Sequence, residues 1–317
     1  MDIGILLWNT CNAKCAHCAV SSGPNEGRRM SNHDIFHIID QAFDNDPQPS
    51  IGLSGGEAFL YYDDLKKIVS YATGRGGLVA INTNCFWADT PENADRIVCE
   101  LIDLKVSKLV ASFDAFHKKY IDEQCVINAI RSCKINHLEI ELQFVASRKS
   151  SRMYSFLEKH ADVFLNISCR EIPCHPVGRA ANMAPTVAFS SDYIPTSRCP
   201  NAVLSVSAEG NYLPCCNTAG HLPSLKLGSI NESQSKVYDR FINSPVMNIL
   251  WEKGPHYFID TAESNGYKHP EYGYIDQCHL CYELFRDKMI SNRLSEFADN
   301  EAFKAIYRDF QENLVKK

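Results

Sequence analysis

The sequence lacks any long hydrophobic run, because no stretch of its 317 residues approaches the roughly 20 apolar residues that cross a bilayer. It also lacks an excess of basic residues: 38 acidic side chains outnumber 32 basic ones, and the net charge is −6. Nucleic acids and anionic membranes attract basic surfaces, so the composition argues against both as partners. The opening segment MDIGILLWN contains no basic residue and is too short for a signal peptide. We therefore expect a cytoplasmic protein that has neither nucleic acid nor a membrane as a partner.

Cysteine, in contrast, is abundant, with 14 residues. In a reducing cytosol, thiols at short spacing indicate metal binding or catalysis and not a disulfide framework. Six of the cysteines are scattered along the chain, and we interpret most of them as small buried hydrophobic residues. The other eight are clustered or follow loop-like segments: Cys11, Cys15, Cys18, Cys199, Cys215, Cys216, Cys278 and Cys281. We expect the chemistry of the protein to depend on these eight.

Strand-like apolar runs alternate with helical patterns from residue 3 to about residue 184. The predicted strands cover 3–8, 50–55, 77–84, 108–114, 137–146 and 163–172. The helical segments between them cover 31–43, 63–73, 91–104, 118–133 and 151–160. Such alternation favours right-handed βαβ units and a parallel sheet. Six units are too few for a closed eightfold barrel, so we predict an α/β fold with a partial (β/α)6 barrel over residues 1–184.

The pattern changes after residue 184, which predicts a second, smaller domain over residues 185–317. Two short strands within 203–216 flank the sequence Glu-Gly-Asn and predict a hairpin. Residues 217–277 show little periodicity apart from a helix near 235–251, and residues 282–313 are helical again.

Three cysteines, Cys11, Cys15 and Cys18, follow the first predicted strand with the spacing Cys-x3-Cys-x2-Cys. A structural zinc site wants four ligands, commonly from two Cys-x-x-Cys pairs. A [4Fe–4S] cluster needs a ligand on each iron, so three thiolates leave one iron able to bind something else. The spacing therefore favours a cluster with an open, catalytic position.

The segment LSGGEAFL follows the second predicted strand and places Gly55, Gly56 and Glu57 at its carboxyl end. Ligand sites of parallel α/β folds gather at this edge of the sheet. Glycine lets backbone approach a ligand closely, and a glutamate accepts hydrogen bonds from an ammonium group. Taken alone, the segment is equally well interpreted as a turn followed by an acidic residue at a helix start.

Found one strand apart, the two motifs resemble those of the radical SAM superfamily. The resemblance implies that the three cysteines hold a [4Fe–4S] cluster, whose fourth iron chelates the amino and carboxylate groups of S-adenosyl-L-methionine. It implies reductive cleavage of this cofactor to methionine and a 5′-deoxyadenosyl radical, which abstracts hydrogen from a substrate. Gly55, Gly56 and Glu57 would bind the cofactor, and His17 matches the aromatic position that covers the cluster.

Polar residues at two further strand ends also resemble cofactor contacts of this superfamily. Ser112 and Asp114 match a Ser-x-Asp pattern near the ribose or the methionyl carboxylate, and Asn84 follows the third strand together with Asn82. The alternative for each is a helix N-cap or turn residue, which Asp and Asn often provide. Arg179, in the phrase PVGRA, is a weaker candidate for a carboxylate partner.

The second set of cysteines resembles a twitch (SPASM-like) auxiliary domain, which carries one additional [4Fe–4S] cluster. Cys199 and Cys215 flank Gly210 with the spacing Cys-x10-Gly-x4-Cys, and Cys278 and Cys281 form Cys-x-x-Cys. These four thiolates would complete a cluster, although a four-thiolate zinc site is a chemically plausible alternative.

Cys216 is left over from both sets. It is interpreted either as a buried thiol, as the ligand in place of Cys215, or as a hydrogen-atom donor. Successive side chains of a strand point to opposite faces. If Cys215 faces the auxiliary cluster, we therefore expect Cys216 to face the mouth of the barrel.

Across residues 5 to about 285 the chain resembles radical SAM peptide epimerases of the YydG type. The shared features are CNxxCxHC, GGExFL, Phe86-Trp87, Asp114-x-x-His117 and the segment that ends in Cys215-Cys216. The resemblance implies removal of an α-hydrogen from an L-residue of a ribosomally made precursor peptide, and its return by Cys216 to give a D-residue. It also implies an electron donor of the flavodoxin or ferredoxin type. Two departures are residues 217–277, which have no match, and Cys85 in place of the usual glycine.

Two other interpretations remain open. A peptide maturase that forms thioether or C–C crosslinks would share the clusters, but such enzymes often carry an N-terminal recognition domain, and here the first strand begins at residue 3. A non-enzymatic iron–sulfur sensor or zinc scaffold would leave the glycine-glutamate segment and the barrel unexplained.

Overall fold

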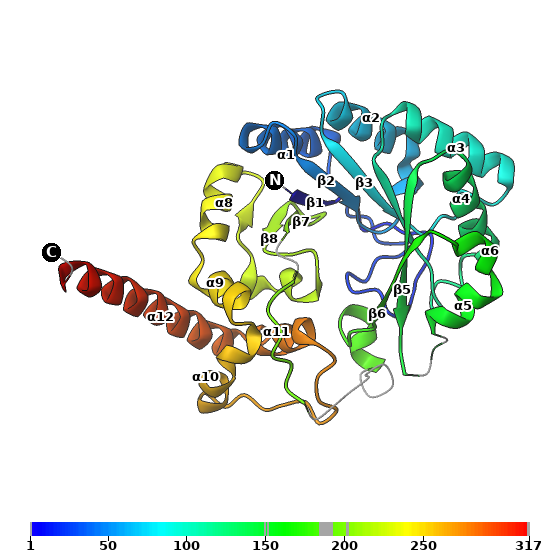
Figure 1. Cartoon of the computed structure of the whole chain (residues 1–317). Coiled ribbons are helices and arrows are strands. Elements are labelled where there is room, and N and C mark those ends of the chain that lie inside the picture. Colours follow the sequence, from blue (N-terminus) through cyan, green and yellow to red (C-terminus); the bar gives the residue numbers. More distant parts are fainter. Residues whose placement is uncertain (1, 149, 151, 184–192, 201–202, 316–317) are drawn as a thin grey trace.

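The computed structural model describes residues 2–148, 150, 152–183, 193–200 and 203–315; the side chains of residues 218 and 306–315 are not described. Within this part of the chain, nine strands form one sheet in the order β6-β5-β4-β3-β2-β1-β7-β8-β9. The first six strands are parallel and curve around a central space (Figure 1). They are β1 (Asp2–Leu6), β2 (Ser50–Ser54), β3 (Leu78–Thr83), β4 (Lys108–Ser112), β5 (Glu139–Ala146) and β6 (Ser168–Pro173). The predicted α/β fold with a partial barrel is confirmed.

Helices connect these strands and cover the outer face of the sheet (Figure 1). They are α1 (Asn32–Asn45), α2 (Tyr62–Thr73), α3 (Pro91–Asp103), α4 (Glu123–Ile135), α5 (Met153–Lys159) and α6 (Ala161–Phe164). Side-chain caps set several of their starts: Thr90 accepts a hydrogen bond from the backbone N–H of Asn93, and Asp122 accepts one from that of Gln124. The cap at Asp122 explains why α4 begins later than the predicted residue 118. The predicted strand 163–172 is wrong in its first part, because α6 ends at Phe164.

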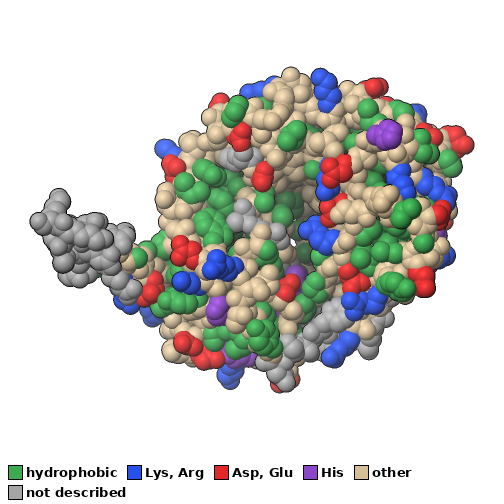
Figure 2. All heavy atoms as spheres, in the orientation of Figure 1, with side chains coloured by type: hydrophobic (Ala, Val, Ile, Leu, Met, Phe, Trp, Pro, Cys, Tyr) green, Lys and Arg blue, Asp and Glu red, His purple; other side chains and the backbone are tan. Residues whose placement is uncertain are grey.

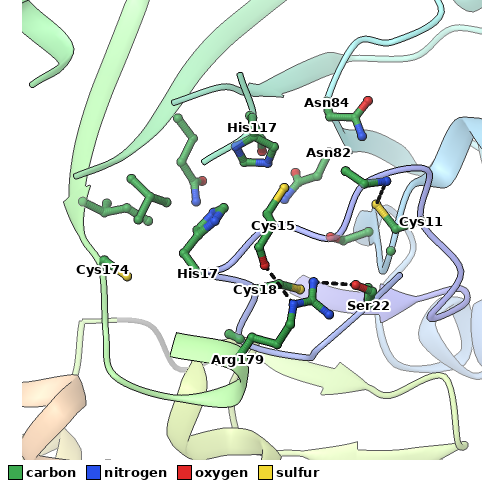
Figure 3. A pocket seen from close by; sticks show the side chains of 18 of the residues that line it. Cys11, Cys15, His17, Cys18, Ser22, Asn82, Asn84, His117, Cys174 and Arg179 are labelled. Atoms are coloured by element: carbon green, nitrogen blue, oxygen red, sulfur yellow. Dashed lines mark hydrogen bonds between the residues drawn. The ribbon is translucent and has the colours of Figure 1, made fainter. Parts of the chain in front are cut away.

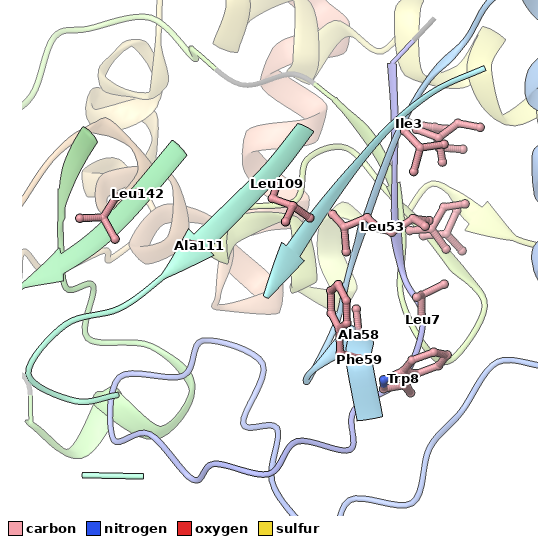
Figure 4. Packing of buried hydrophobic residues seen from close by; sticks show 14 of the residues in the cluster. Ile3, Leu7, Trp8, Leu53, Ala58, Phe59, Leu109, Ala111 and Leu142 are labelled. Atoms are coloured by element: carbon pink, nitrogen blue, oxygen red, sulfur yellow. The ribbon is translucent and has the colours of Figure 1, made fainter. Parts of the chain in front are cut away.

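The core lies between the helices and the outward face of the strands. Alternate strand residues such as Ile81, Leu109 and Leu142 are fully buried there. Figure 4 shows part of this layer, with Ile3, Leu53, Leu109 and Leu142 projecting from their strands. The intervening residues face the inside of the curved sheet, where the strands present small or polar side chains.

The C-terminal part continues the same sheet. β7 (Leu204–Val206) pairs in parallel with β1, and β8 (Asn211–Leu213) and β9 (Gly228–Ser229) follow antiparallel, so the predicted hairpin is present. The predicted boundary at 184/185 falls in a segment outside the described residues and stays a prediction.

The helices of the C-terminal part follow the hairpin, and α12 projects from the body of the molecule (Figure 1). They are α8 (Gln234–Ile242), α9 (Pro245–Glu252), α10 (Ile259–Ser264), α11 (Gln277–Phe285) and α12 (Lys288–Val315). The predicted single helix near 235–251 is two helices, because Ser244 caps a new one that starts with Pro245. Short 3-10 helices occur at η1 (Ala58–Tyr61), η2 (Gly178–Met183), η3 (Thr218–His221), η4 (Pro223–Leu225) and η5 (Pro255–Phe258). Among the described residues, none of the helices combines the length and apolar character that crossing a bilayer requires.

Candidate functional site

A pocket of about 300 Å³ lies inside the curve of the sheet, at the carboxyl ends of the parallel strands (Figure 3). The loop that follows β1 contributes Cys11, Cys15, His17 and Cys18 to its wall. Residues on β2 to β6 also line the pocket: Ser54, Asn82, Ser112, Gln143, Val145 and Ile172. The chain brings its N-terminal cysteines to the edge where parallel α/β folds place their sites.

The three cysteines of the N-terminal motif face this pocket together. The pKa of Cys11 is raised to about 11 and that of Cys15 to about 12, mainly by burial. The neighbouring thiols raise both pKa values further. The thiols of Cys11 and Cys15 are therefore protonated until a metal displaces their protons. Three soft ligands around one space fit the three protein-bound irons of a [4Fe–4S] cluster.

Arg179 holds the cysteine loop in place. Its Nε donates to the carbonyl oxygen of Cys15 at 2.9 Å, and its Nη2 donates to that of Ser22 at 2.5 Å (Figure 3). Its backbone N–H donates to the carbonyl of Cys18 at 3.1 Å. The charge of Arg179 lowers the pKa of Cys11 and Cys15. Arg179 also lines the pocket, and its expected role as a weak candidate for a carboxylate partner stays a prediction.

Gly55 and Gly56 form a turn that packs directly on the strand exit leading to the cysteine loop. The backbone N–H of Gly56 donates to the carbonyl of Trp8 at 2.6 Å. A Cβ on Gly55 would lie 2.4 Å from the Trp8 carbonyl oxygen, and one on Gly56 would lie 2.0 Å from that of Thr10. Both glycines line the pocket, but this close backbone contact already requires glycine at the two positions.

Glu57 is buried, with 2% of its surface exposed, and is absent from the pocket wall. One carboxylate oxygen accepts from the hydroxyl of Thr83 at 2.9 Å and from the Phe59 N–H at 3.1 Å. The other accepts from the Asn84 N–H at 2.7 Å. Burial raises the pKa of Glu57 to about 7 against the opposing effect of these hydrogen bonds. These bonds fasten the glycine turn to the end of β3, and the expected contact of Glu57 with the cofactor's ammonium group stays a prediction.

We expect a Glu57→Gln substitution to lower the free energy of unfolding by about 1–3 kcal/mol, because an amide NH₂ would face a backbone donor in a buried site. Chemical denaturation measures this change, and Glu158→Gln on the exposed face of α5 is the matched control. A variant that matches the wild type in stability but binds S-adenosyl-L-methionine more weakly would instead support the direct contact with the ammonium group.

Ser112 and Asn84 line the pocket, as does Asn82. The Asn84 amide donates to the side chain of Asn12 at 2.8 Å, and its oxygen accepts from the Phe86 N–H at 3.1 Å. Cys85, which follows, has a φ of 62°. That backbone conformation accounts for the glycine more usual at this position.

Asp114 is buried and is not itself part of the pocket wall, but its Oδ2 lies 3.0 Å from Nδ1 of His117 and 3.6 Å from Nε2 of His17, and both histidines line the pocket. Its carboxylate accepts from the backbone N–H groups of Phe116, His117 and Val145 at 2.8, 3.1 and 3.2 Å. Burial would raise the pKa of this carboxyl, but these bonds and the imidazoles of His117 and His17 hold it at about 2. The backbone contacts are those of a turn residue, and a role of Asp114 in cofactor binding stays a prediction.

His17 and His117 lie beside Cys15. One ligand atom from each of these three residues lies within 4.8 Å of the others. His17 also stacks on Phe116 with 4.9 Å between ring centroids. Burial lowers the pKa of His17 to about 4, so this imidazole is neutral at pH 7.

The cysteines of the second set meet in the C-terminal part. Cys278 and Cys281 lie one turn apart on α11, where the side chain of Asp276 caps the helix. Burial raises the thiol pKa of both residues, and the charges of Cys199 and Cys215 raise it further. Burial also raises the pKa of Cys215 to about 12. The four thiols, which come from three segments, are thus close enough to affect one another's pKa, and this supports the prediction that they share one site.

Cys215 and Cys216 point to different sites, although not for the reason that we expected. β8 ends at Leu213, so both cysteines lie on the following loop and the alternation of a strand does not apply. Cys215 neighbours the thiols of Cys199, Cys278 and Cys281, whereas Cys216 and Asn217 line the pocket inside the sheet. Desolvation by the surrounding protein raises the pKa of the Cys216 thiol.

His175 is a pocket residue that the sequence did not reveal. It follows β6 and lines the pocket, and its Nε2 lies 2.9 Å from a carboxylate oxygen of Asp276. This contact joins the barrel to the cap of the helix that carries Cys278 and Cys281. No spacing pattern connects two residues 101 positions apart.

The sequence is similar to known proteins over parts or most of its length. The sequence profile described as the Radical SAM superfamily matches residues 5–139. YydG of Bacillus subtilis (strain 168), named for peptide biosynthesis, is 24% identical over 315 residues, which are 95% of this chain and 98% of YydG. Pre-heme d1 synthase of Dinoroseobacter shibae is 25% identical over 168 residues, 50% of this chain and 40% of its own.

Solved structures share the fold. Native anSMEcpe with bound AdoMet superimposes with a TM-score of 0.60 at 14% identity, covering 94% of this chain and 99% of its own. The same enzyme with bound AdoMet and Kp18Cys peptide gives a TM-score of 0.58 at 13% identity, covering 95% and 100% of the two chains.

Proposed function

We propose that this chain, whose residues 5–139 form a radical SAM domain, is a peptide epimerase that converts L-residues of a ribosomally made peptide into D-residues. The observation that carries the proposal is the position of Cys216, which belongs to neither group of converging cysteines and lines the same pocket as Cys11, Cys15 and Cys18. The match to YydG, named for peptide biosynthesis, supports a peptide as the substrate.

Two sets of residues would hold the cofactors. Cys11, Cys15 and Cys18 would bind one [4Fe–4S] cluster beside S-adenosyl-L-methionine, and the tetrathiolate site on α11 and the β8 loop would bind a second. When bound, the first cluster and S-adenosyl-L-methionine supply the 5′-deoxyadenosyl radical that removes the α-hydrogen of the substrate. The loop contacts of Arg179 keep the three cysteines in position for this cluster.

Cys216 then returns the hydrogen. A carbon-centred radical is planar, so inversion requires delivery from the face opposite the adenosine. The S–H bond of Cys216 breaks homolytically and a Cα–H bond forms, which leaves a thiyl radical on the enzyme. One electron from a donor of the flavodoxin or ferredoxin type and one proton from water restore the thiol. The raised thiol pKa supports this role, because a thiolate has no hydrogen atom to give.

The test uses the reconstituted enzyme with S-adenosyl-L-methionine, a reductant and the peptides encoded by short reading frames beside its gene, all in D₂O. We expect a D-residue with one deuterium at Cα, because a thiol hydrogen exchanges with water, and 5′-deoxyadenosine that carries the substrate's hydrogen. Chiral amino-acid analysis and mass spectrometry measure both products. A peptide that has lost two hydrogens and gained a crosslink would identify a maturase instead, and a protein that forms no 5′-deoxyadenosine would identify a sensor.

A further inference from the structure

One row of the inner face of the sheet carries almost no side chains. The register places Gly4 of β1 opposite Gly52 of β2, and Gly52 opposite Ala80 of β3. The residues before and after each of the three are buried on the outer side, so these three positions face inward. All three remain partly exposed even though they lie in central strands. The space inside the curved sheet is therefore open at this level, and Figure 2 shows the surface hollowed at its centre.

The two glycines are not required by the backbone. Neither has the positive φ that marks Gly55, and a Cβ on Gly52 would make only ordinary contacts, at 3.8 Å from the Ile3 carbonyl oxygen and 4.0 Å from the Gly4 Cα. A Cβ on Gly4 would meet no backbone atom closely, but it would lie 2.9 Å from the hydroxyl of Ser205. Glycine inside a strand weakens the sheet and often marks a place where a ligand approaches. At Gly52 the missing side chain therefore indicates space for a ligand, and at Gly4 this space is bounded by the side chains of Ser205 and Cys216.

This space adjoins Cys216. A Cβ on Gly4 would lie 4.0 Å from the Cβ of Cys216, so the row of small residues begins beside the thiol that lines the pocket. At the other end of the row, the charge of Lys108 is neutralised by two carboxylates. Lys108, which the register places opposite Ala80, binds the carboxylates of Glu139 and Glu141 at 3.2 and 2.7 Å.

We propose that the row formed by Gly4, Gly52 and Ala80 is the subsite for the side chain of the residue that is modified, and that it selects an uncharged side chain larger than alanine. The inference rests on the proposed epimerase function. With the side chain over the glycines, the Cα of that residue lies between the cofactor end of the pocket and Cys216. The glycines then set the size of the residue that is accepted.

The test enlarges the side chain at Gly52 and, in parallel, shortens the side chain of the modified residue in the peptide to alanine. Gly52→Ala and Gly52→Val are assayed with the substrate peptide and with the same peptide carrying alanine at the modified position. We expect Gly52→Val to lower kcat/KM for the natural peptide at least about tenfold, as added methyl groups in a specificity pocket do. Turnover of the alanine peptide by Gly52→Val should stay near the wild-type value. For the natural peptide, kcat/KM of Gly52→Ala should lie between the values of the wild type and of Gly52→Val.

The controls separate a subsite from a folding defect. Thermal unfolding and iron content should be unchanged in Gly52→Val, because valine suits a strand and the first added carbon meets ordinary contacts. Gly27→Val, at an exposed position where a Cβ would touch nothing within 4 Å, should process both peptides normally. Fluorescence anisotropy should show weaker binding of the natural peptide alone to Gly52→Val.

The subsite is refuted if a folded, iron-loaded Gly52→Val protein slows both peptides equally or slows neither. A wild-type protein that forms 5′-deoxyadenosine but epimerises neither peptide would refute the proposed function itself, before any variant is compared.

Discussion

A Cys216→Ala protein should remove hydrogen from the peptide and yet produce no D-residue. Its pocket keeps the three N-terminal cysteines that are proposed to hold the cluster beside S-adenosyl-L-methionine, so 5′-deoxyadenosine should still form and carry the substrate's hydrogen. The peptide radical then has no thiol to take a hydrogen from, and it should divert to other products. Chiral analysis of the peptide and mass spectrometry of the nucleoside measure the two halves of the reaction separately.

The same substitution tests the division of roles between the two adjacent cysteines. Iron content should be unchanged in Cys216→Ala, because Cys215, and not Cys216, neighbours Cys199, Cys278 and Cys281. Cys216→Ser should fail in the same way, since an O–H bond is a much poorer hydrogen-atom donor than an S–H bond. Cys99→Ala, at an exposed cysteine on α3, is the matched control and should be fully active. A Cys216→Ala protein that loses iron, or that still epimerises, would show that the assignment of the two neighbours is wrong.

Replacement of Cys11, Cys15 and Cys18 together by alanine should abolish cleavage of S-adenosyl-L-methionine and lower the iron content from about eight to about four atoms per chain. The three thiols share one pocket wall, and the four thiols of the C-terminal site lie elsewhere. Iron analysis and electron paramagnetic resonance under anaerobic conditions measure the loss, and chromatography of 5′-deoxyadenosine measures cleavage.

The reciprocal variant provides the control for that prediction. Alanine at Cys278 and Cys281 should remove the other half of the iron and leave the N-terminal cluster in place. The three thiols of the N-terminal loop line the pocket inside the sheet, whereas Cys278 and Cys281 lie on α11, so each loss should be independent of the other. A wild-type protein that holds four iron atoms with one zinc ion would contradict the second cluster and support the zinc alternative.

Much of the fold follows from local sequence. The alternation of Ile3, Ile5, Ile51 and Leu53 with small residues predicts buried parallel strands, and Thr90 with Pro91 predicts the start of α3. Such features depend on periods of two or 3.6 residues and on single capping bonds, which need no knowledge of distant segments. The error at β6 arose where a short apolar helix, α6, precedes the strand, because periodicity does not separate two short apolar elements.

The candidate site, too, has features that local sequence predicts and features that depend on contacts between distant segments. The spacing of Cys11, Cys15 and Cys18 on one short loop is enough to predict three converging ligands, because a short loop restricts where its side chains can point. The sequence could not show that Glu57 and Asp114 turn into the protein, because backbone donors on neighbouring strands determine that direction. It could not show that His175 meets Asp276 either.

The sequence by itself determined the cofactor motifs, the partial barrel and the four cysteines that could form a second site. The tertiary structure decided which site each cysteine joins: Cys215 lies near the other three thiols, and Cys216 lines the pocket inside the sheet. The physical reason is that spacing along the chain restrains only neighbouring residues. The direction of a side chain on a loop is set by the segments that pack against it, and here those segments come from β1, β7 and α11.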